Sequence, residues 1–500
     1  MTQHTGLVAA FVKAVIAANP DYDALDRVYL TNRVLALVGD GALALTTTTT
    51  NTIDLKNELV DFAQQQDQIG ASAPERDILG AQLMDLYTPT PSTVNRTFWK
   101  QYARSPQAAT EYFHQLSESN DYIQTRQIAK NIRYLAPTDY GDLEITINLS
   151  KPEKDPKAIA AAAKQKSNHS YPQCQLCLEN EGYLGRLDFP ARSNHRIIRF
   201  DINGHHWGFQ YSPYAYFNEH SIFLDTIHEP MHITRQTFVN LLHIVDIWPH
   251  YFVGSNADLP IVGGSMLAHE HYQGGRHTFP MAVAPLDYAF AWPAHADVSC
   301  GVVHWPMSCI RLTASNEAPL IAAAENVRSA WQEYSDESLD IRAYTGGTQH
   351  HTVTPIARRT ASGDYQLDLV LRDNQTSSKY PDGIFHPHQD VQHIKKENIG
   401  LIEVMGLAVL PARLKSELAE VEKFVLGQPN AMKEYHRPWA DQLAHAHAGQ
   451  ITADNVHGIV QQAVGQVFRR VLLDAGVFKR DDAGQAGFKQ FVRALTQSAK

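Results

Sequence analysis

The chain has 500 residues, of which 44% are hydrophobic and 19% are charged, and these fractions are ordinary for a soluble globular protein of several domains. Its 43 basic and 53 acidic residues give a formal net charge of −10, which argues against a nucleic-acid binder that relies on a clustered basic surface. Because no apolar stretch is long enough to span a membrane and the N-terminus lacks the pattern of a signal peptide, we expect no membrane partner and a cytoplasmic location.

The first 140 or so residues have the pattern of helices. Apolar residues recur at helical spacing in residues 7–16, 25–38 and 55–62. Asp23 and Asn51 stand where helix N-caps are expected, because their side chains can accept hydrogen bonds from the first unpaired backbone amides. This part of the chain is therefore predicted to be a helical region.

Strands mixed with helices are expected from about residue 142 onwards. Apolar and polar residues alternate in 143–149, which predicts a strand, and an Ala-rich helix is predicted at 157–164. Further strands are predicted at 196–202, 207–211, 221–225, 260–264 and 279–284, and a helix at 234–247.

A second series of similar elements follows and returns to helix at the C-terminus. It comprises predicted strands near 302–313 and at 352–357, 366–372 and 401–409, with helices at 321–334 and from 412 to 426 and beyond. This order predicts an α+β fold with antiparallel sheets. We divide the chain into a helical N-terminal region (1–140), a catalytic half (141–285), a second, related half (286–411) and a helical C-terminal region (412–500).

The segment GGSMLAHEHYQGG, residues 263–275, carries the strongest chemical signal. His269, His271 and Gln273 are spaced two apart, so on an extended strand their side chains project to one face. The flanking glycine pairs allow the backbone to approach a ligand closely. Imidazole is nucleophilic near neutral pH and an amide can donate to a phosphate oxygen, so this face suits attack on phosphorus. The alternative is a pair of histidines with a purely structural role.

Cys174 and Cys177 form a C-x-x-C motif, which can supply two thiolates to a tetrahedral zinc ion. The sequence contains no second such motif, so histidines must supply the other two ligands, and His228 and His269 are the candidates. A redox motif would open a helix, whereas residues 179–182 have the composition of a loop. Two ordinary cysteines without a metal are the alternative.

Two further segments are rich in polar side chains. Lys151 and Lys154 lie in a proline-containing turn and can clamp a diphosphate, although a solvated charged turn is the simpler interpretation. Residues 385–396, FHPHQDVQHIKK, contain a second H-x-H, but they lack the glycine pairs. This second histidine segment is either a second polar patch for a phosphate or metal or a solvated loop, and we favour the loop unless His393 and Lys395 face the pocket.

At the C-x-x-C motif, at HEPMHI and at GGSMLAHEHYQGG the chain resembles the galactose-1-phosphate uridylyltransferases, and in particular their class II branch. The resemblance extends over nearly the whole chain, including LEITINLSKPEKDP, NHRII and NIGLIEVMGLAVLP. Because this family belongs to the histidine-triad superfamily, the resemblance implies two related halves, each with a half-barrel of antiparallel strands. It also implies that UDP-glucose and galactose 1-phosphate become glucose 1-phosphate and UDP-galactose by a ping-pong route through a uridylyl-histidine.

Carried onto this chain, the resemblance assigns a role to each motif residue. His271 becomes the nucleophile, Gln273 contacts the transferred phosphate, and Asn256 and Ser265 match further phosphate contacts of the class I branch. The implied zinc ligands are Cys174, Cys177, His228 and His269.

Two departures from class I flank the nucleophile. Glu270 stands where class I has proline, and Tyr272 stands where class I has glycine. The helical N-terminal region and the C-terminal tail are also foreign to class I, so metal content and sugar contacts stay open. We expect either a backbone carbonyl or Glu270 to hold the second ring nitrogen of His271 and so fix its tautomer.

The resemblance further implies a homodimer without an organic cofactor, with UDP-glucose, UDP-galactose and hexose 1-phosphates as partners. Two half-reactions suit this chemistry, because one pocket then accepts each hexose phosphate in turn. Two alternatives stay open. A histidine-triad hydrolase or phosphorylase passes the nucleotidyl group to water or inorganic phosphate, and a non-catalytic nucleotide-sugar binding protein needs no nucleophile.

Overall fold

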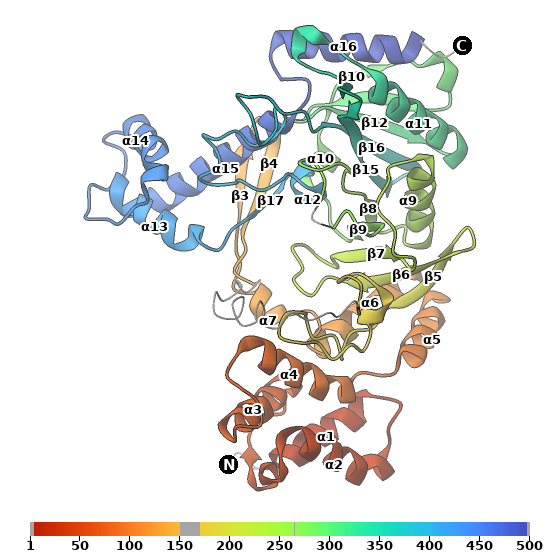
Figure 1. Ribbon diagram of the computed structural model, residues 1–500, viewed down its shortest axis with the longest axis vertical. Coiled ribbons are helices and arrows are strands. Elements are labelled where there is room, and N and C mark those ends of the chain that lie inside the picture. The colour runs from red at the N-terminus through yellow and green to blue at the C-terminus, as the bar shows by residue number, and fades with distance from the viewer. Residues whose placement is uncertain (1–4, 151–170, 265, 498–500) are drawn as a thin grey trace. The chain divides into compact units, whose positions relative to one another are not determined.

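The computed structural model describes residues 5–150, 171–264 and 266–497, and the chain divides into two compact units (Figure 1). Unit 1 comprises Met1–Ala129, Lys151–Ala215 and Glu219–Glu229, and unit 2 comprises Lys130–Ser150, Tyr216–Asn218 and Pro230–Lys500. Each unit is therefore assembled from stretches that are separate in the sequence. No described helix is both long and apolar enough to cross a membrane.

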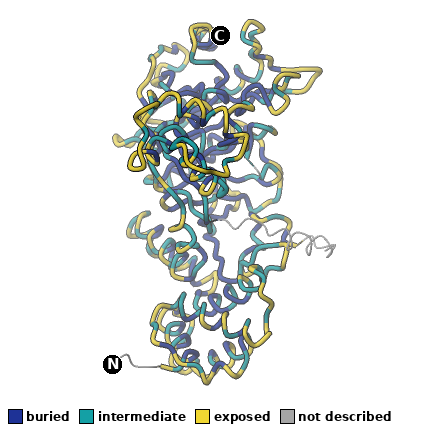
Figure 2. The backbone as a smooth tube through the Cα atoms, turned by 90° about the vertical axis from the view of Figure 1, so that its left-hand side faces the viewer, coloured by how far each residue is buried: buried dark blue, intermediate teal, exposed yellow. Residues whose placement is uncertain are grey.

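Unit 1 begins with the predicted helices. They are α1 (Leu7–Ala18), α2 (Arg27–Val38), α3 (Thr52–Gln65), α4 (Ala73–Tyr87), α5 (Pro91–Tyr102), α6 (Pro106–Ser119) and α7 (Thr125–Ile128), with a short pair of strands, β1 (Thr5–Gly6) and β2 (Thr46–Thr47). The Asn51 side chain caps α3 by accepting from the amides of Ile53 and Asp54, as predicted. The helices α1–α4 enclose a core that includes Phe11 and Leu59, and Figure 2 shows such buried stretches in dark blue.

Unit 1 also contains an antiparallel meander of β5 (Ile198–Ile202), β6 (His205–Tyr211) and β7 (Ser221–Asp225). Aromatic side chains join it to the helices of the same unit. Phe209 of β6 stacks on Phe223 of β7, and it meets Phe98 of α5 and Phe113 of α6 edge-on, with ring centroids 6.0 and 5.5 Å apart. Because β7 ends shortly before His228, this packing fixes the base of the loop that carries that histidine.

The larger sheet of unit 2 is antiparallel. In spatial order its strands are β10 (Leu286–Phe290), β11 (Ser299–Val303), β12 (Cys309–Ala314), β16 (Tyr365–Asp373), β15 (His351–Arg359), β8 (Phe252–Gly254) and β9 (His271–Gly275). The helices α9 (Arg235–Ile247) and α11 (Glu317–Glu333) contact each other and β15. A small hairpin pairs β13 (Tyr344–Thr345) with β14 (Thr348–Gln349).

A second sheet in unit 2 joins strands that are far apart in the sequence. β3 (Ile132–Thr138) pairs antiparallel with β4 (Gly141–Ile147), and β17 (Leu407–Leu410) pairs parallel with the other edge of β4. The remaining helices are α10 (Pro280–Val283), α12 (Leu401–Val404), α13 (Leu414–Val425), α14 (Arg437–Ala446), α15 (Val456–Ala475) and α16 (Asp482–Gln497). The predicted α+β class and helical C-terminal region are thus confirmed, and β17 and β4 add a parallel pair to the antiparallel ones.

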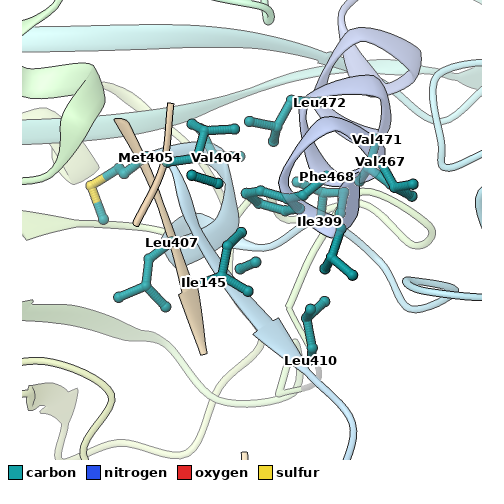
Figure 3. Packing of buried hydrophobic residues seen from close by; sticks show 14 of the residues in the cluster. Ile145, Ile399, Val404, Met405, Leu407, Leu410, Val467, Phe468, Val471 and Leu472 are labelled. Atoms are coloured by element: carbon teal, nitrogen blue, oxygen red, sulfur yellow. The ribbon is translucent and has the colours of Figure 1, made fainter. Parts of the chain in front are cut away.

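The core beside this second sheet is shown in Figure 3. Phe468 of α15 is fully buried and shares a hydrophobic cluster with Ile145 of β4, Leu407 of β17 and Val404 of α12. The indole N–H of Trp305 donates to the Val404 carbonyl at 2.9 Å, which satisfies a buried polar group. Burial of each large apolar side chain stabilises the unit by about 1.5–3 kcal/mol.

Three local predictions are wrong. Residues 279–284 form the short helix α10 instead of a strand, because Pro280 occupies its first position, where proline is favoured. Residues 260–264 form a turn with a single bridge between Ala257 and Gly263. Residues 401–409 split into α12 and β17, because Gly406 adopts a φ of +107° that ends the helix. The helix predicted at 157–164 lies outside the described residues.

Candidate active site

The strand β9 carries His271 and Gln273 of the H-x-H-x-Q segment and lies beside β8 in the larger sheet. It pairs with β8 through Gly254 and Gln273. The strand begins at His271, whereas His269 lies in a bend before it, so the prediction that both histidines lie on one extended strand is wrong. The preceding loop folds back on itself, and its Leu267 carbonyl accepts a hydrogen bond from the backbone amide of Met231 at 2.9 Å.

The His271 imidazole is held by the backbone carbonyl of His269. Its Nδ1 lies 2.8 Å from the carbonyl oxygen of His269, which can only accept a hydrogen bond. The proton of a neutral ring must therefore sit on Nδ1, and the lone pair must sit on Nε2. Burial lowers the pKa of His271 to about 4, so the ring is neutral at neutral pH. A neutral imidazole with its lone pair on Nε2 is a competent nucleophile.

Gln273 follows two residues later on the same strand, so its side chain leaves β9 on the same side as that of His271. Gln273 is half-buried, while His271 is 6% exposed. His271 and Gln273 thus share one side of β9, as their spacing predicted.

Glu270 does not hold the nucleophile. Its Oε1 accepts a hydrogen bond from the Tyr272 hydroxyl at 2.7 Å, and its Oε2 accepts from the backbone amide of His232 at 3.3 Å. Of the two groups expected to fix the tautomer, the structure therefore selects the backbone carbonyl of His269.

The predicted phosphate contacts are described only in part. Asn256 is buried, and its Oδ1 accepts a hydrogen bond from the Leu401 amide at 2.9 Å. A Cβ at Gly264 would lie 2.6 Å from the Asn256 Nδ2, so this glycine is required by close packing within the loop. Lys151, Lys154 and Ser265 lie outside the described residues.

A Cys/His group lies in unit 1. The Sγ atoms of Cys174 and Cys177 are 3.5 Å apart, and the Cys177 Sγ lies 3.1 Å from Nδ1 of His228. Burial and the adjacent Cys174 sulfur raise the pKa of Cys177 to about 12, which disfavours a thiolate unless a cation is bound. The ligand atoms of all three residues lie within 4.8 Å of one another, so this donor set fits zinc. His269, the fourth predicted ligand, belongs to unit 2 and is 1% exposed.

The second histidine segment does not form a solvated loop, and that interpretation was wrong. His386 and Lys395 are buried, and the Lys395 ammonium donates to Glu403 at 3.0 Å and to the Val409 carbonyl at 3.2 Å. The His388 Nε2 lies 3.0 Å from the Ile384 carbonyl. The segment packs as a buried structural element because its charged groups have partners inside unit 2.

Comparisons with known proteins identify the family. Residues 20–230 match the N-terminal domain, and residues 244–441 the C-terminal domain, of galactose-1-phosphate uridyl transferase. The chain is 61% identical over 488 residues to "Galactose-1-phosphate uridylyltransferase" of Lacticaseibacillus casei, which covers 98% of this chain and 99% of that protein. The protein of the same name from Lactiplantibacillus plantarum is 62% identical, with 97% and 98% covered.

The chain belongs to the galactose-1-phosphate uridylyltransferase family. The relative of that name from Streptococcus mutans is 57% identical and covers 98% of this chain and 99% of its own length. The crystal structure of yeast Ap4A phosphorylase is similar at a TM-score of 0.31 and 11% identity, and it covers 60% of this chain and 89% of that chain. As a member of this family, the chain is a nucleotidyltransferase enzyme.

Two residues beside the candidate site, Asn240 and Tyr272, were not assigned a role from the sequence. The Tyr272 hydroxyl accepts a hydrogen bond from the Asn240 amide at 3.0 Å, and it donates to Glu270. The position of Tyr272 between His271 and Gln273 was a signal that it faces away from the nucleophile. Its bond to α9 could not be read from the pattern, because Asn240 lies in a different element.

Proposed function

We propose that the chain transfers the uridylyl group of UDP-glucose to galactose 1-phosphate, with His271 as the nucleophile. The observation that supports this proposal is the bond between the His271 Nδ1 and the His269 carbonyl, because it directs the lone pair of a buried, neutral imidazole to Nε2. The family's name and the full-length similarity supply the substrates.

In the first half-reaction, the His271 Nε2 attacks the α-phosphorus of UDP-glucose. A phosphorus–nitrogen bond forms, the bond from that phosphorus to the oxygen of glucose 1-phosphate breaks, and glucose 1-phosphate leaves with the electron pair. In the second half-reaction, a phosphate oxygen of galactose 1-phosphate attacks the same phosphorus, and the nitrogen leaves as a neutral imidazole. Gln273 donates to a non-bridging oxygen as charge develops there.

We assign supporting roles to the other motif residues. Asn256 and Ser265 contact the transferred phosphate, and Lys151 and Lys154 offset the charge of the diphosphate. Cys174, Cys177, His228 and His269 are the residues that would hold a zinc ion, through two thiolate sulfurs and two imidazole nitrogens. Four ligands of this kind make a closed structural site with no open position for substrate. We further propose that the enzyme acts in the cytoplasm and that it is a homodimer. Sedimentation of the purified protein tests the oligomeric state.

Intact-mass measurement after incubation with UDP-glucose tests the nucleophile. The wild-type chain is expected to gain the mass of one uridylyl group, and His271→Ala is expected to gain none. Addition of galactose 1-phosphate must then discharge the adduct and release UDP-galactose. Discharge by water or inorganic phosphate alone would instead assign the chain to the hydrolases or phosphorylases, and binding of UDP-glucose without any adduct would make it a sensor.

A further inference from the structure

The side of β9 that faces away from His271 carries a buried hydrogen-bonded cluster. Tyr272 is fully buried, its hydroxyl donates to Glu270 at 2.7 Å, and it accepts from the Asn240 amide of α9 at 3.0 Å. These three side chains, Asn240, Glu270 and Tyr272, are called the β9 clamp below. All of them belong to unit 2, so the cluster ties the catalytic strand to a helix of the same compact unit.

A second set of bonds fastens the loop before β9 to the segment that leads into α9. The Met231 amide donates to the Leu267 carbonyl at 2.9 Å, the His232 amide to Glu270 at 3.3 Å, and the Ile233 amide to Asp258 at 2.8 Å. Three consecutive amides are thus held by one loop. Glu270 takes part in both sets of bonds, so it joins the β9 clamp to the entry of the helix.

The β9 clamp is linked covalently, through Glu270, to the peptide group that holds the His271 ring. The carbonyl that holds the His271 Nδ1 belongs to His269, and its peptide plane includes the nitrogen of Glu270. Rotation of this peptide would turn the carbonyl away from the imidazole. The Glu270 side chain is anchored by its bonds to the Tyr272 hydroxyl and the His232 amide, and these bonds resist that rotation.

We propose that Glu270 and Tyr272, with Asn240 behind them, are positioning residues that hold the His269 carbonyl against His271 and thereby select the tautomer with its lone pair on Nε2. This inference rests on the proposed function of His271. None of the three residues needs to touch the substrate. They act because an imidazole without a fixed acceptor at Nδ1 populates both tautomers, and the tautomer protonated on Nε2 cannot attack phosphorus.

Tyr272→Phe tests the proposal, because it removes the hydroxyl and leaves the ring. Nitrogen NMR of histidine-labelled enzyme without substrate, with the His271 signals identified by their loss in His271→Gln, reports the tautomer directly. We expect the fraction protonated on Nδ1 to fall, and the rate of adduct formation from UDP-glucose to drop about tenfold with little change in the Kd of UDP-glucose.

Tyr365→Phe is the matched control, since Tyr365 is a buried tyrosine of β16 whose hydroxyl donates to the carboxylates of Asp246 and Glu317. It is expected to lower thermal stability to a similar degree without changing the His271 tautomer. If Tyr272→Phe shifts the melting temperature like the control and leaves both tautomer and adduct rate unchanged, the positioning role is wrong.

Two further variants keep the proposal testable if Tyr272→Phe folds poorly. Asn240→Ala removes the bond to the Tyr272 hydroxyl, and it is expected to shift the tautomer in the same direction by a smaller amount. Glu270→Gln keeps an acceptor for Tyr272 and should retain more adduct formation than Glu270→Ala, whereas equal loss in both would count against the β9 clamp.

Measuring the His271 tautomer and the adduct separately distinguishes failure of this inference from failure of the proposed function on which it rests. An unchanged adduct rate in Tyr272→Phe would overturn the positioning role and leave the nucleophile assigned. A wild-type chain that never forms the adduct would overturn the proposed function, while the NMR comparison would still decide whether the β9 clamp sets the tautomer.

Discussion

Two H-x-H segments of unit 2, at residues 269–271 and 386–388, look alike in sequence and differ in what surrounds them. In residues 269–273, the carbonyl of His269 occupies the His271 Nδ1, and the other ring nitrogen carries the lone pair. In residues 386–388, His386 and His388 approach the backbone carbonyls of Pro387 and Ile384, in a segment stabilised by a buried ammonium–carboxylate pair. The comparison teaches that spacing alone does not make a nucleophile. The chemistry depends on which ring nitrogen the fold leaves available.

The largest expected difference between the two segments is in turnover. His271→Ala should reduce the conversion of UDP-glucose and galactose 1-phosphate by more than about 10³-fold, because the proposed nucleophile is lost. His388→Ala should retain most of the activity, since its ring contacts only Tyr380, Asp474 and a carbonyl in the part of unit 2 that the structure describes. Equal losses in the two variants, measured by product formation, would erase the distinction.

Metal content gives a second contrast, between the cysteines proposed to hold zinc and those outside that group. Cys177→Ser should lower zinc affinity at least tenfold. Removing a residue that only hydrogen-bonds to a metal ligand already has an effect of about this size. Elemental analysis of the purified protein measures it. The matched control is Cys300→Ser, whose Sγ is 3.4 Å from the Val298 carbonyl and does not belong to the metal cluster. Wild-type protein without zinc after metal-supplemented expression would refute the site.

Two adjacent lysines of the second histidine segment are expected to differ in their contribution to stability. The attraction of Glu403 and Glu397 outweighs burial and raises the pKa of Lys395, so the ammonium is charged and paired. Lys395→Met should lower the free energy of unfolding by about 3 kcal/mol, because it leaves the largely buried Glu403 carboxylate without this partner. Lys396→Met, at an exposed position, should change it by less than about 0.5 kcal/mol in denaturant titrations.

The smallest expected effect is on the pH dependence of stability. Burial, with the nearby His436 and Arg413 charges, lowers the pKa of His393 to about 4, whereas Asp390 acts to raise it. An unfolded histidine binds its proton near pH 6.5, so unfolding takes up a proton between about pH 6.5 and 4, and stability falls as the pH decreases through this interval. His393→Gln should make that decline shallower in urea titrations. An unchanged slope would mean that His393 titrates normally in the folded protein.

The sequence predicted a helix or strand correctly where the signal lies within the element itself, as a capping residue or a hydrophobic pattern. The Asn51 cap of α3 and the strands β5, β6 and β7 follow from residue types within each segment. Short elements set by context were missed. A four-residue helix such as α10 has no periodicity to detect, and the apolar run at 401–409 conceals the turn that Gly406 makes between α12 and β17.

The site was predictable where the spacing of residues along the chain determines the direction of their side chains. Alternation along β9 places His271 and Gln273 together, and the C-x-x-C motif with His228 forms the expected group in unit 1. The hydrogen-bond partner of Glu270 could not be predicted, because many donors in the chain could bond to its carboxylate. Only the fold brings Tyr272 and Asn240 together beside it. The burial of residues 385–396 was missed for the same reason: the counterion of Lys395 is supplied by a later helix.

The parallel pairing of β17 with β4 has a consequence for how the protein is made. Leu407 pairs with Glu144, so a strand synthesised early waits for a partner that emerges only after most of the chain has been translated. Such non-local pairing is slow to form and leaves the edge of β4 exposed in nascent chains. A fragment that begins at residue 230 would lack β3 and β4 altogether, so unit 2 cannot be produced by simple truncation and would have to be expressed together with residues 130–150.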